Sequence, residues 1–238
     1  WVVGFVSYEG GLAFDLPCHE PSDLAPLAWL AAYDARNVLR LDPDEVPDLP
    51  PPAGLADTQV QLNVGREAYG AALDRIHAYI AAGDTYQVNF TCHARFAADW
   101  DPLAYFLTLA RSHPVPYAAY LDLGDRQVLS LSPELFLQRR GTVLASRPMK
   151  GTRKRGRTLE EDAALAADLT TSVKDRAENL MILDMVRNDL GRVGRIGSVR
   201  VPAMFTAEKY RSVWQMTSTV EADLDPAVTL PELFAATF

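Results

Sequence analysis

SPELFLQRRGTVLASRPMKGT, residues 132–152, is the stretch around which the rest of the chain is best understood. Apolar and polar side chains alternate in both halves of it, and Arg140-Gly141 separates the halves. Glycine accepts the positive φ that tight turns need, so the pattern predicts a two-stranded antiparallel hairpin. With these two residues as the loop, Glu134 is expected opposite Arg147.

The end of this stretch carries a lone lysine, Lys150, two residues after Pro148 and directly before Gly151. A regular pleat would place Lys150 and Glu134 on opposite faces of the hairpin. Pro148 has no N–H for the ladder, and Gly151 permits a sharp change of direction, so both interrupt the pleat. We therefore expect the backbone to turn the Lys150 amine toward the Glu134 carboxylate.

Lys150 is a candidate nucleophile. Burial or neighbouring cations can lower the pKa of a lysine, and Arg147, Arg153 and Lys154 supply positive charge nearby. The alternative interpretation is a solvated lysine beside a mobile basic loop, RKRGR at residues 153–157.

Five segments along the chain carry a family resemblance. They are YIAAGDTYQVNFT, LSLSPELF, RPMKGTRKRG, KDRAENLMILDMVRNDLGRVG and GSVRVPAMF, in this order. Together they closely resemble the chorismate-utilising enzymes, and within that family the aminodeoxychorismate synthase component I branch. The discriminating position is Lys150, because the related anthranilate synthases resemble PIAGT there, with alanine in place of lysine.

The resemblance implies a covalent mechanism. Lys150 would attack the chorismate ring and expel the 4-hydroxyl, and ammonia would then displace the lysine to leave an amine at C4. Glu134 would be the general acid that protonates the departing hydroxyl. Gly151 and Thr152 match the substrate-contacting pair of the family, and a backbone N–H and a hydroxyl are suitable donors to a substrate carboxylate.

The same resemblance implies a cofactor and a partner. Glu178, in the AEN motif, is similar to a magnesium ligand, and Mg²⁺ prefers hard oxygen ligands such as carboxylates. A glutamine amidotransferase subunit or domain would supply the ammonia. Asp184 and Arg187 belong to the same motif, but their spacing favours pairing within one helix. Gln215 stands where some relatives have an active-site histidine, and an amide cannot shuttle a proton near neutral pH.

Composition and charge exclude several classes of protein. The 238 residues carry a net charge of -8, which argues against binding to nucleic acid. No apolar run reaches the length of about 18 residues that a membrane-spanning helix needs, and no secretion signal is visible. The cytoplasm is therefore the expected location. Cys18 and Cys92 are too few for a disulfide framework.

Periodicity predicts an α+β protein with antiparallel sheets. Strand patterns cover residues 1–8, 27–41 (as a pair of strands), 86–96, 116–131, 197–204 and 213–220. Helical patterns cover residues 66–82, 102–112 and 159–193, and a further helix is predicted from residue 229 onward. Within 159–193 a new helix is expected to begin at Ser172. The resemblance sharpens this to a partial chorismate-utilising-enzyme fold, in which antiparallel β-sheets pack with outer helices.

Two regions are expected along the chain. Residues 1–65 form a partial N-terminal strand region with a proline-rich linker near 42–57, and residues 66–238 form a chorismate-binding domain. The chain starts inside an apolar run at Trp1 and stops within a predicted helix at Phe238. We therefore expect it to be cut at both ends, so that the C-terminal part of the domain, with a second metal-binding glutamate, is missing.

Two alternatives stay open at this point. One is another chorismate enzyme, an anthranilate or isochorismate synthase. The other belongs to a different class: a catalytically silent binding or regulatory fragment that acts through a partner.

Overall fold

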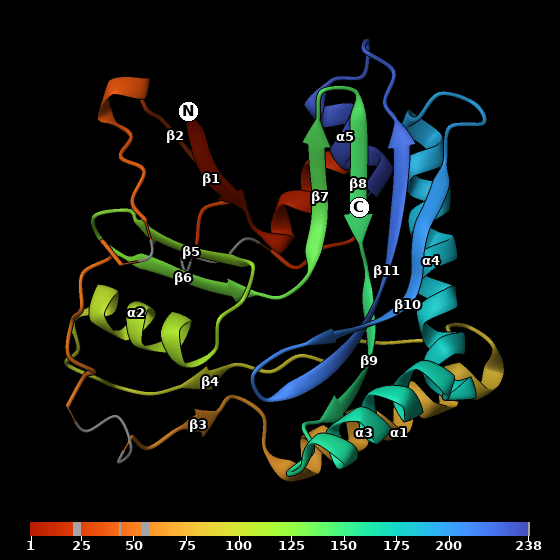
Figure 1. The fold of residues 1–238 in the computed structure, drawn as a ribbon, viewed down its shortest axis with the longest axis horizontal. Helices are drawn as coiled ribbons and strands as arrows, with labels where there is room; N and C mark the ends of the chain where they lie inside the picture. The colour runs from red at the N-terminus through yellow and green to blue at the C-terminus, as the bar shows by residue number, and fades with distance from the viewer. Residues whose placement is uncertain (21–24, 43, 54–57, 238) are drawn as a thin grey trace. The chain divides into compact units, whose positions relative to one another are not determined.

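The computed structural model describes residues 1–20, 25–42, 44–53 and 58–237 (Figure 1). It mixes helices with antiparallel sheets, as the α+β prediction requires. The chain separates into two compact units, Trp1–Asp48 with Leu109–Phe238 and Leu49–Thr108, and each is described by itself. Of the predicted linker, residues 43 and 54–57 lie outside the described residues, and the predicted division near residue 65 stays a prediction.

A five-stranded antiparallel sheet dominates the larger unit. Its strands run in the order β10 (Arg200–Lys209), β11 (Val213–Asp223), β8 (Val143–Arg147) and β7 (Leu135–Arg140), and β9 (Met149–Lys154) also pairs with β11. The helices of this unit are α3 (Leu159–Thr171), α4 (Val173–Val193) and α5 (Leu230–Thr237), and α4 lies along the sheet (Figure 1). Both predicted strands near the C-terminus are present and are longer than expected.

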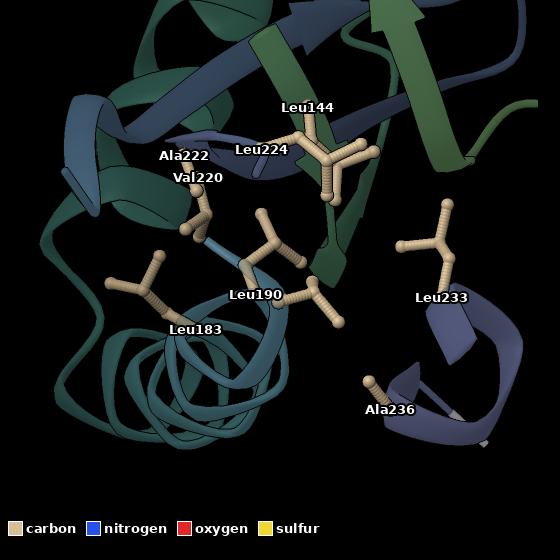
Figure 2. Close-up of a cluster of buried hydrophobic side chains, with 9 residues drawn as sticks. Leu144, Leu183, Leu190, Val220, Ala222, Leu224, Leu233 and Ala236 are labelled. Carbon is tan, nitrogen blue, oxygen red and sulfur yellow. The ribbon is translucent and has the colours of Figure 1, made fainter. Parts of the chain in front are cut away.

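The core of this unit lies between α4 and the sheet. Leu183 and Leu190 are one heptad apart, so they share a face of α4, and both are buried. Figure 2 shows their side chains on the side of the helix that faces Val220 and Ala222 of β11. Each buried leucine stabilises the fold by about 1.5–3 kcal/mol. The apolar row of α4 therefore fixes this helix, and the AEN motif at its start, against the sheet.

Ser172 ends one helix and begins the next, as predicted. Its side chain accepts a hydrogen bond from the backbone N–H of Asp175, which is the capping arrangement of a helix N-terminus. Arg153 of β9 donates to Asp175 at 2.7 Å and to Asp168 at 2.6 Å, so one guanidinium joins the strand to both helices.

Two further strand pairs belong to the larger unit. They are β1 (Val2–Val6) with β2 (Ala28–Ala32), and β5 (Tyr117–Asp122) with β6 (Gln127–Ser132). The 3-10 segments η1 (Tyr8–Phe14) and η2 (Ala35–Asn37) complete it. The prediction of two strands within 27–41 is wrong for the second strand, because Asp34 accepts from the Arg36 N–H and turns the chain into η2.

The smaller unit contains α1 (Arg66–Ala82), β3 (Gln61–Leu62) and β4 (Ala94–Arg95), and α2 (Pro102–Ser112) extends past its end. Both helices have the predicted bounds. The long strand predicted over 86–96 is wrong, since only β4 pairs, with β3. Alternation favours a strand only where a partner runs alongside, and β3 offers two residues. No helix of the described residues is long and apolar enough to cross a membrane.

A buried carboxylate anchors the turn that follows β9. Asp162 of α3 accepts hydrogen bonds from the Arg155 guanidinium, from the Gly156 N–H at 2.8 Å and from Trp214 Nε1 at 2.8 Å. Arg155 also lies over the Trp214 ring, 5.0 Å from its centroid. The hydrogen bonds from Arg155, against the opposing effect of burial, hold the pKa of the Asp162 carboxyl well below its ordinary value of 3.8.

This depressed pKa makes stability depend on pH in a definite direction. The Asp162 anchor stabilises the fold fully above the unfolded pKa and loses its effect as pH falls toward the folded pKa. We expect Asp162→Asn to lower the melting temperature by several degrees near neutral pH, and the difference from wild type to shrink below about pH 4. Melting curves across pH test this, with Asp184→Asn as a control in an exposed ion pair. A difference that grows on acidification contradicts the expectation.

Candidate functional site

Glu134 lies just before β7 and not within a regular strand. The hairpin forms as predicted, but its loop is Gly141-Thr142, because Arg140 pairs with Val143. The predicted pairing of Glu134 with Arg147 is wrong. A register shift between residues 135 and 138 places Leu135 opposite Arg147 instead. Two residues of β7, Phe136 and Leu137, thus oppose Ser146 alone, and Glu134 lies before the first paired residue of the strand.

The Glu134 carboxylate forms a hydrogen bond with the backbone next to Lys150. Its Oε1 accepts a hydrogen bond from the Met149 N–H at 2.8 Å. The Ser132 hydroxyl lies 3.2 Å from the Glu134 carbonyl and 3.3 Å from its N–H, which ties the turn together. The carboxylate thus contacts the backbone of the residue directly before Lys150.

Lys150 lies on β9, and Pro148 separates this strand from the hairpin. The side chain is half-buried, and within the described residues it forms no ion pair with Glu134 or another carboxylate at 4.0 Å or less. Its carbonyl accepts a hydrogen bond from the amide of Asn179 at 3.3 Å. The expected approach of the amine to Glu134 therefore stays a prediction.

Gly151 supplies the change of direction that the sequence predicts. Its φ is 100°, a value that side-chain-bearing residues rarely adopt. An added Cβ would lie 3.1 Å from Leu169, 3.2 Å from Asp175 and 3.3 Å from Met216, so a larger residue would also require these neighbours to shift by a few tenths of an ångström. The backbone next to Lys150 therefore strongly favours glycine at position 151.

Thr152 is exposed, and its hydroxyl donates a hydrogen bond to Oε1 of Gln215 at 2.9 Å. The two residues are direct partners between β9 and β11, so their side chains share a face of the sheet. Gln215 thus orients the hydroxyl of a predicted substrate-binding residue. A histidine role is absent at this position, as the sequence indicates.

The cations that were expected to influence Lys150 are each paired with a carboxylate. Arg147 contacts Glu208 at 3.1 Å, and Lys154 contacts Glu161 at 3.9 Å. Arg153 is paired with the two aspartates of the helix junction described above. These pairs neutralise most of the nearby positive charge.

Glu178 lies in the second turn of α4, half-buried, with its carboxylate 3.8 Å from the ammonium of Lys174. Within the described residues no group of three or more His, Cys, Asp or Glu side chains is placed to hold a metal ion. The carboxylate is a suitable magnesium ligand, but it would need oxygen atoms from a substrate or from water to complete the shell. Farther along α4, Arg187 pairs with Asp184 at 2.8 Å, as predicted.

A groove of about 430 Å³ runs between β7 and α4 and includes Glu134 at its edge. The α4 residues that line it include Ile182 and Asp189, and burial raises the pKa of the Asp189 carboxyl. Glu178 lies four residues before Ile182, so it shares that face of the helix. Glu134 lines this groove from the turn before β7, whereas Glu178 lies on α4 but is not among the lining residues.

Two groups of residues in this region were not predicted from the sequence. Asn179 is fully buried: its amide donates to the carbonyls of Lys150 and Met216, and its oxygen accepts from the Ser218 hydroxyl at 2.6 Å. Its position directly after Glu178 in the AEN motif was the available signal. Glu208 and its partners gave no local signal, because they come from separate strands.

Comparison with known proteins identifies the class. The family model of chorismate binding enzymes matches residues 1–238, and the chain belongs to that family. Over 201 residues it is 45% identical to an aminodeoxychorismate synthase of Streptomyces griseus, a match that covers 83% of this chain and 27% of that protein. Over 172 residues it is 41% identical to aminodeoxychorismate synthase component 1 of Bacillus subtilis, covering 72% of this chain and 37% of the relative.

The fold has counterparts among solved structures. Anthranilate synthase component I of Streptococcus pneumoniae TIGR4 superposes with a TM-score of 0.70 and 26% identity, over 83% of this chain and 42% of that chain. The chain spans well under half the length of these relatives. The predicted family and fold are confirmed.

Proposed function

We propose that this chain is part of an aminodeoxychorismate synthase component I, which converts chorismate and ammonia to 4-amino-4-deoxychorismate on the route to p-aminobenzoate and folate. The observation that carries the proposal is Lys150, held on β9 between the Glu134-bound Met149 and the left-handed Gly151. Similarity to proteins with that name supports it.

The proposed chemistry uses two side chains of this chain. Glu134 gives its proton to the 4-hydroxyl oxygen, the C–O bond breaks and water leaves, while Nζ of Lys150 forms a bond to the ring. Ammonia then forms the bond to C4 as the lysine–ring bond breaks, and its extra proton returns to the Glu134 carboxylate. A positioned acid accelerates such a step by about 10²- to 10⁴-fold, because hydroxide is a poor leaving group.

Other side chains bind and orient the substrate. The Gly151 N–H donates to a carboxylate of chorismate, and the Thr152 hydroxyl also donates to it after exchanging Oε1 of Gln215, its acceptor in this structure, for a substrate oxygen. Glu178 is the residue that would hold Mg²⁺, which neutralises substrate carboxylate charge when bound. Glu178 alone would leave the remaining ligand positions of the ion to oxygen atoms of the substrate or of water.

The ammonia source and the location are also proposals. Relatives named as component 1 support a second component, and a glutamine amidotransferase subunit or domain would supply ammonia in the cytoplasm. Neither nucleic acid nor a membrane is a proposed partner.

Product identification tests the proposed function. The full-length protein, incubated with chorismate, Mg²⁺ and excess ammonium, is expected to form aminodeoxychorismate, identified by mass. Ammonium replaces the partner as the nitrogen source, and chelation of Mg²⁺ is expected to abolish the reaction. Anthranilate or isochorismate as the product, or binding of chorismate without turnover, would overturn the proposal.

A second candidate function rests on a specific observation. The chain is 37% identical over 190 residues to anthranilate synthase component 1 of Neisseria gonorrhoeae, covering 80% of this chain and 39% of that protein. Anthranilate synthesis needs an attack by ammonia and no lysine nucleophile, so Lys150 disfavours it. The product assay separates the two functions in one experiment.

A further inference from the structure

Glu208 of β10 is the centre of a hydrogen-bonded cluster on the five-stranded sheet, and its side chain is only 22% exposed. Its Oε1 accepts from Thr217 at 2.8 Å and from Arg147 Nη1 at 3.1 Å. Its Oε2 lies 3.1 Å from the hydroxyl of Tyr210. One carboxylate therefore joins side chains from β8, β10 and β11.

The charge of Arg147 is paired within this cluster. Its Nε is buried and has no hydrogen-bond partner within the described residues, so the contact with Glu208 is the ion pair that offsets its burial. The following residues are Pro148 and Met149, and Lys150 is three positions away. Thr217, the second partner of Glu208, pairs with Met149 across the sheet. Glu208 thus holds both strands that position the lysine segment.

Tyr210 extends the cluster to the segment of the proposed acid. Its hydroxyl lies 3.3 Å from the carbonyl oxygen of Pro133, the residue before Glu134. Burial, and next the charge of Glu208, raise the pKa of Tyr210 to about 12, so its proton is retained at neutral pH. The hydroxyl has a single hydrogen, and the carboxylate of Glu208 and the carbonyl of Pro133 share it as acceptors. The Glu134 turn and the Lys150 segment are therefore linked through the same carboxylate.

We propose that Glu208 is a positioning residue that sets the separation between the Glu134 carboxyl and the Lys150 amine. Tyr210 connects Glu208 to the turn that carries Glu134. The proposal rests on the proposed function of these two groups. In this proposal, neither Glu208 nor Tyr210 contacts the substrate. A displacement of about 1 Å between reacting groups lowers rates by about 10²-fold, so a cluster that fixes this separation controls the chemical step.

Single-turnover formation of the lysine adduct tests the proposal. Full-length protein is mixed with chorismate and Mg²⁺ without ammonia, and the rate and amplitude of the adduct are followed by intact-protein mass. We expect Glu208→Gln to slow adduct formation by about 10²-fold and Tyr210→Phe by about tenfold, with unchanged amplitude. In steady state with ammonium, kcat falls by similar factors and KM changes by less than about threefold.

Glu221→Gln is the matched control. Glu221 also sits on the sheet and pairs with an arginine, Arg200, at 2.9 Å, but belongs to the other end of β11. It is expected to leave the adduct rate unchanged. A merely structural role for Glu208 predicts a lower amplitude at the wild-type rate, and that result overturns the proposal. Absence of an adduct in the wild type overturns the proposed covalent function instead, so the two failures are distinct.

Discussion

Lys150→Ala is expected to lower kcat for aminodeoxychorismate formation by about 10⁴-fold or more, the scale seen when an enzyme loses its covalent nucleophile. The reason is chemical, because the variant lacks the amine that forms the bond to the ring in the proposed mechanism. Lys150→Arg should be equally inactive, since a guanidinium stays protonated and cannot attack. The measurement is turnover with excess ammonium, together with intact-protein mass after incubation with chorismate alone.

The matched control for this prediction is Lys154→Ala. Lys154 lies four residues later on the same strand and is exposed, with its ammonium near Glu161. Its removal is expected to leave kcat within about twofold of wild type, as is usual for exposed ion pairs. Turnover to aminodeoxychorismate that survives in Lys150→Ala would show direct attack by ammonia and end the covalent mechanism.

Asn179→Ala is expected to destabilise the fold by about 3–5 kcal/mol, a large fraction of the stability of an ordinary domain. The fully buried amide serves three partners, so its loss leaves the Lys150 and Met216 carbonyls and the Ser218 hydroxyl without one hydrogen bond each. Unpaired buried polar groups cost about 1–3 kcal/mol apiece. Chemical denaturation of the wild type and the variant measures the difference.

Ser218→Ala separates the contributions within this network. It removes the hydroxyl that donates to Asn179 and accepts from the Phe205 N–H at 3.1 Å, but leaves the amide bonds to both strands intact. We expect a smaller loss, about 1–2 kcal/mol. An equal or larger loss in Ser218→Ala would place the main stabilisation at Phe205, whose φ is 55°, and not at the junction of β9 and β11.

Local signals predicted the elements well where short-range chemistry determines them. The 3.6-residue apolar period and the stop at Gly83 predicted α1, and the capping pattern at Ser172 predicted the break between α3 and α4. Alternation alone misled at 86–96, where the chain lacks a neighbour for most of its length. Strand formation depends on a partner that a local pattern cannot reveal.

The sequence proposed the residues of the candidate site, but it did not predict the contacts that connect them. The family resemblance assigned roles to Glu134, Lys150 and Gly151, and these stay predictions, while the positive φ of the glycine was expected and is present. The pairing of β9 with β11 and the contact of Glu208 with Arg147 join residues about 60 or more positions apart. Such contacts follow from how the strands are ordered in the sheet, which the sequence pattern does not specify.

The position of β11 in the sheet has a consequence for how the chain acquires its structure. This strand pairs with β8, β9 and β10, yet it comes after all of them in the sequence. During synthesis the hairpin and the lysine-bearing strand therefore emerge before their common neighbour exists. Contacts of such long sequence separation form slowly, because loop closure must precede them. Nascent chains that end before residue 213 would present unpaired strand edges, which favour aggregation until β11 is available to pair with them.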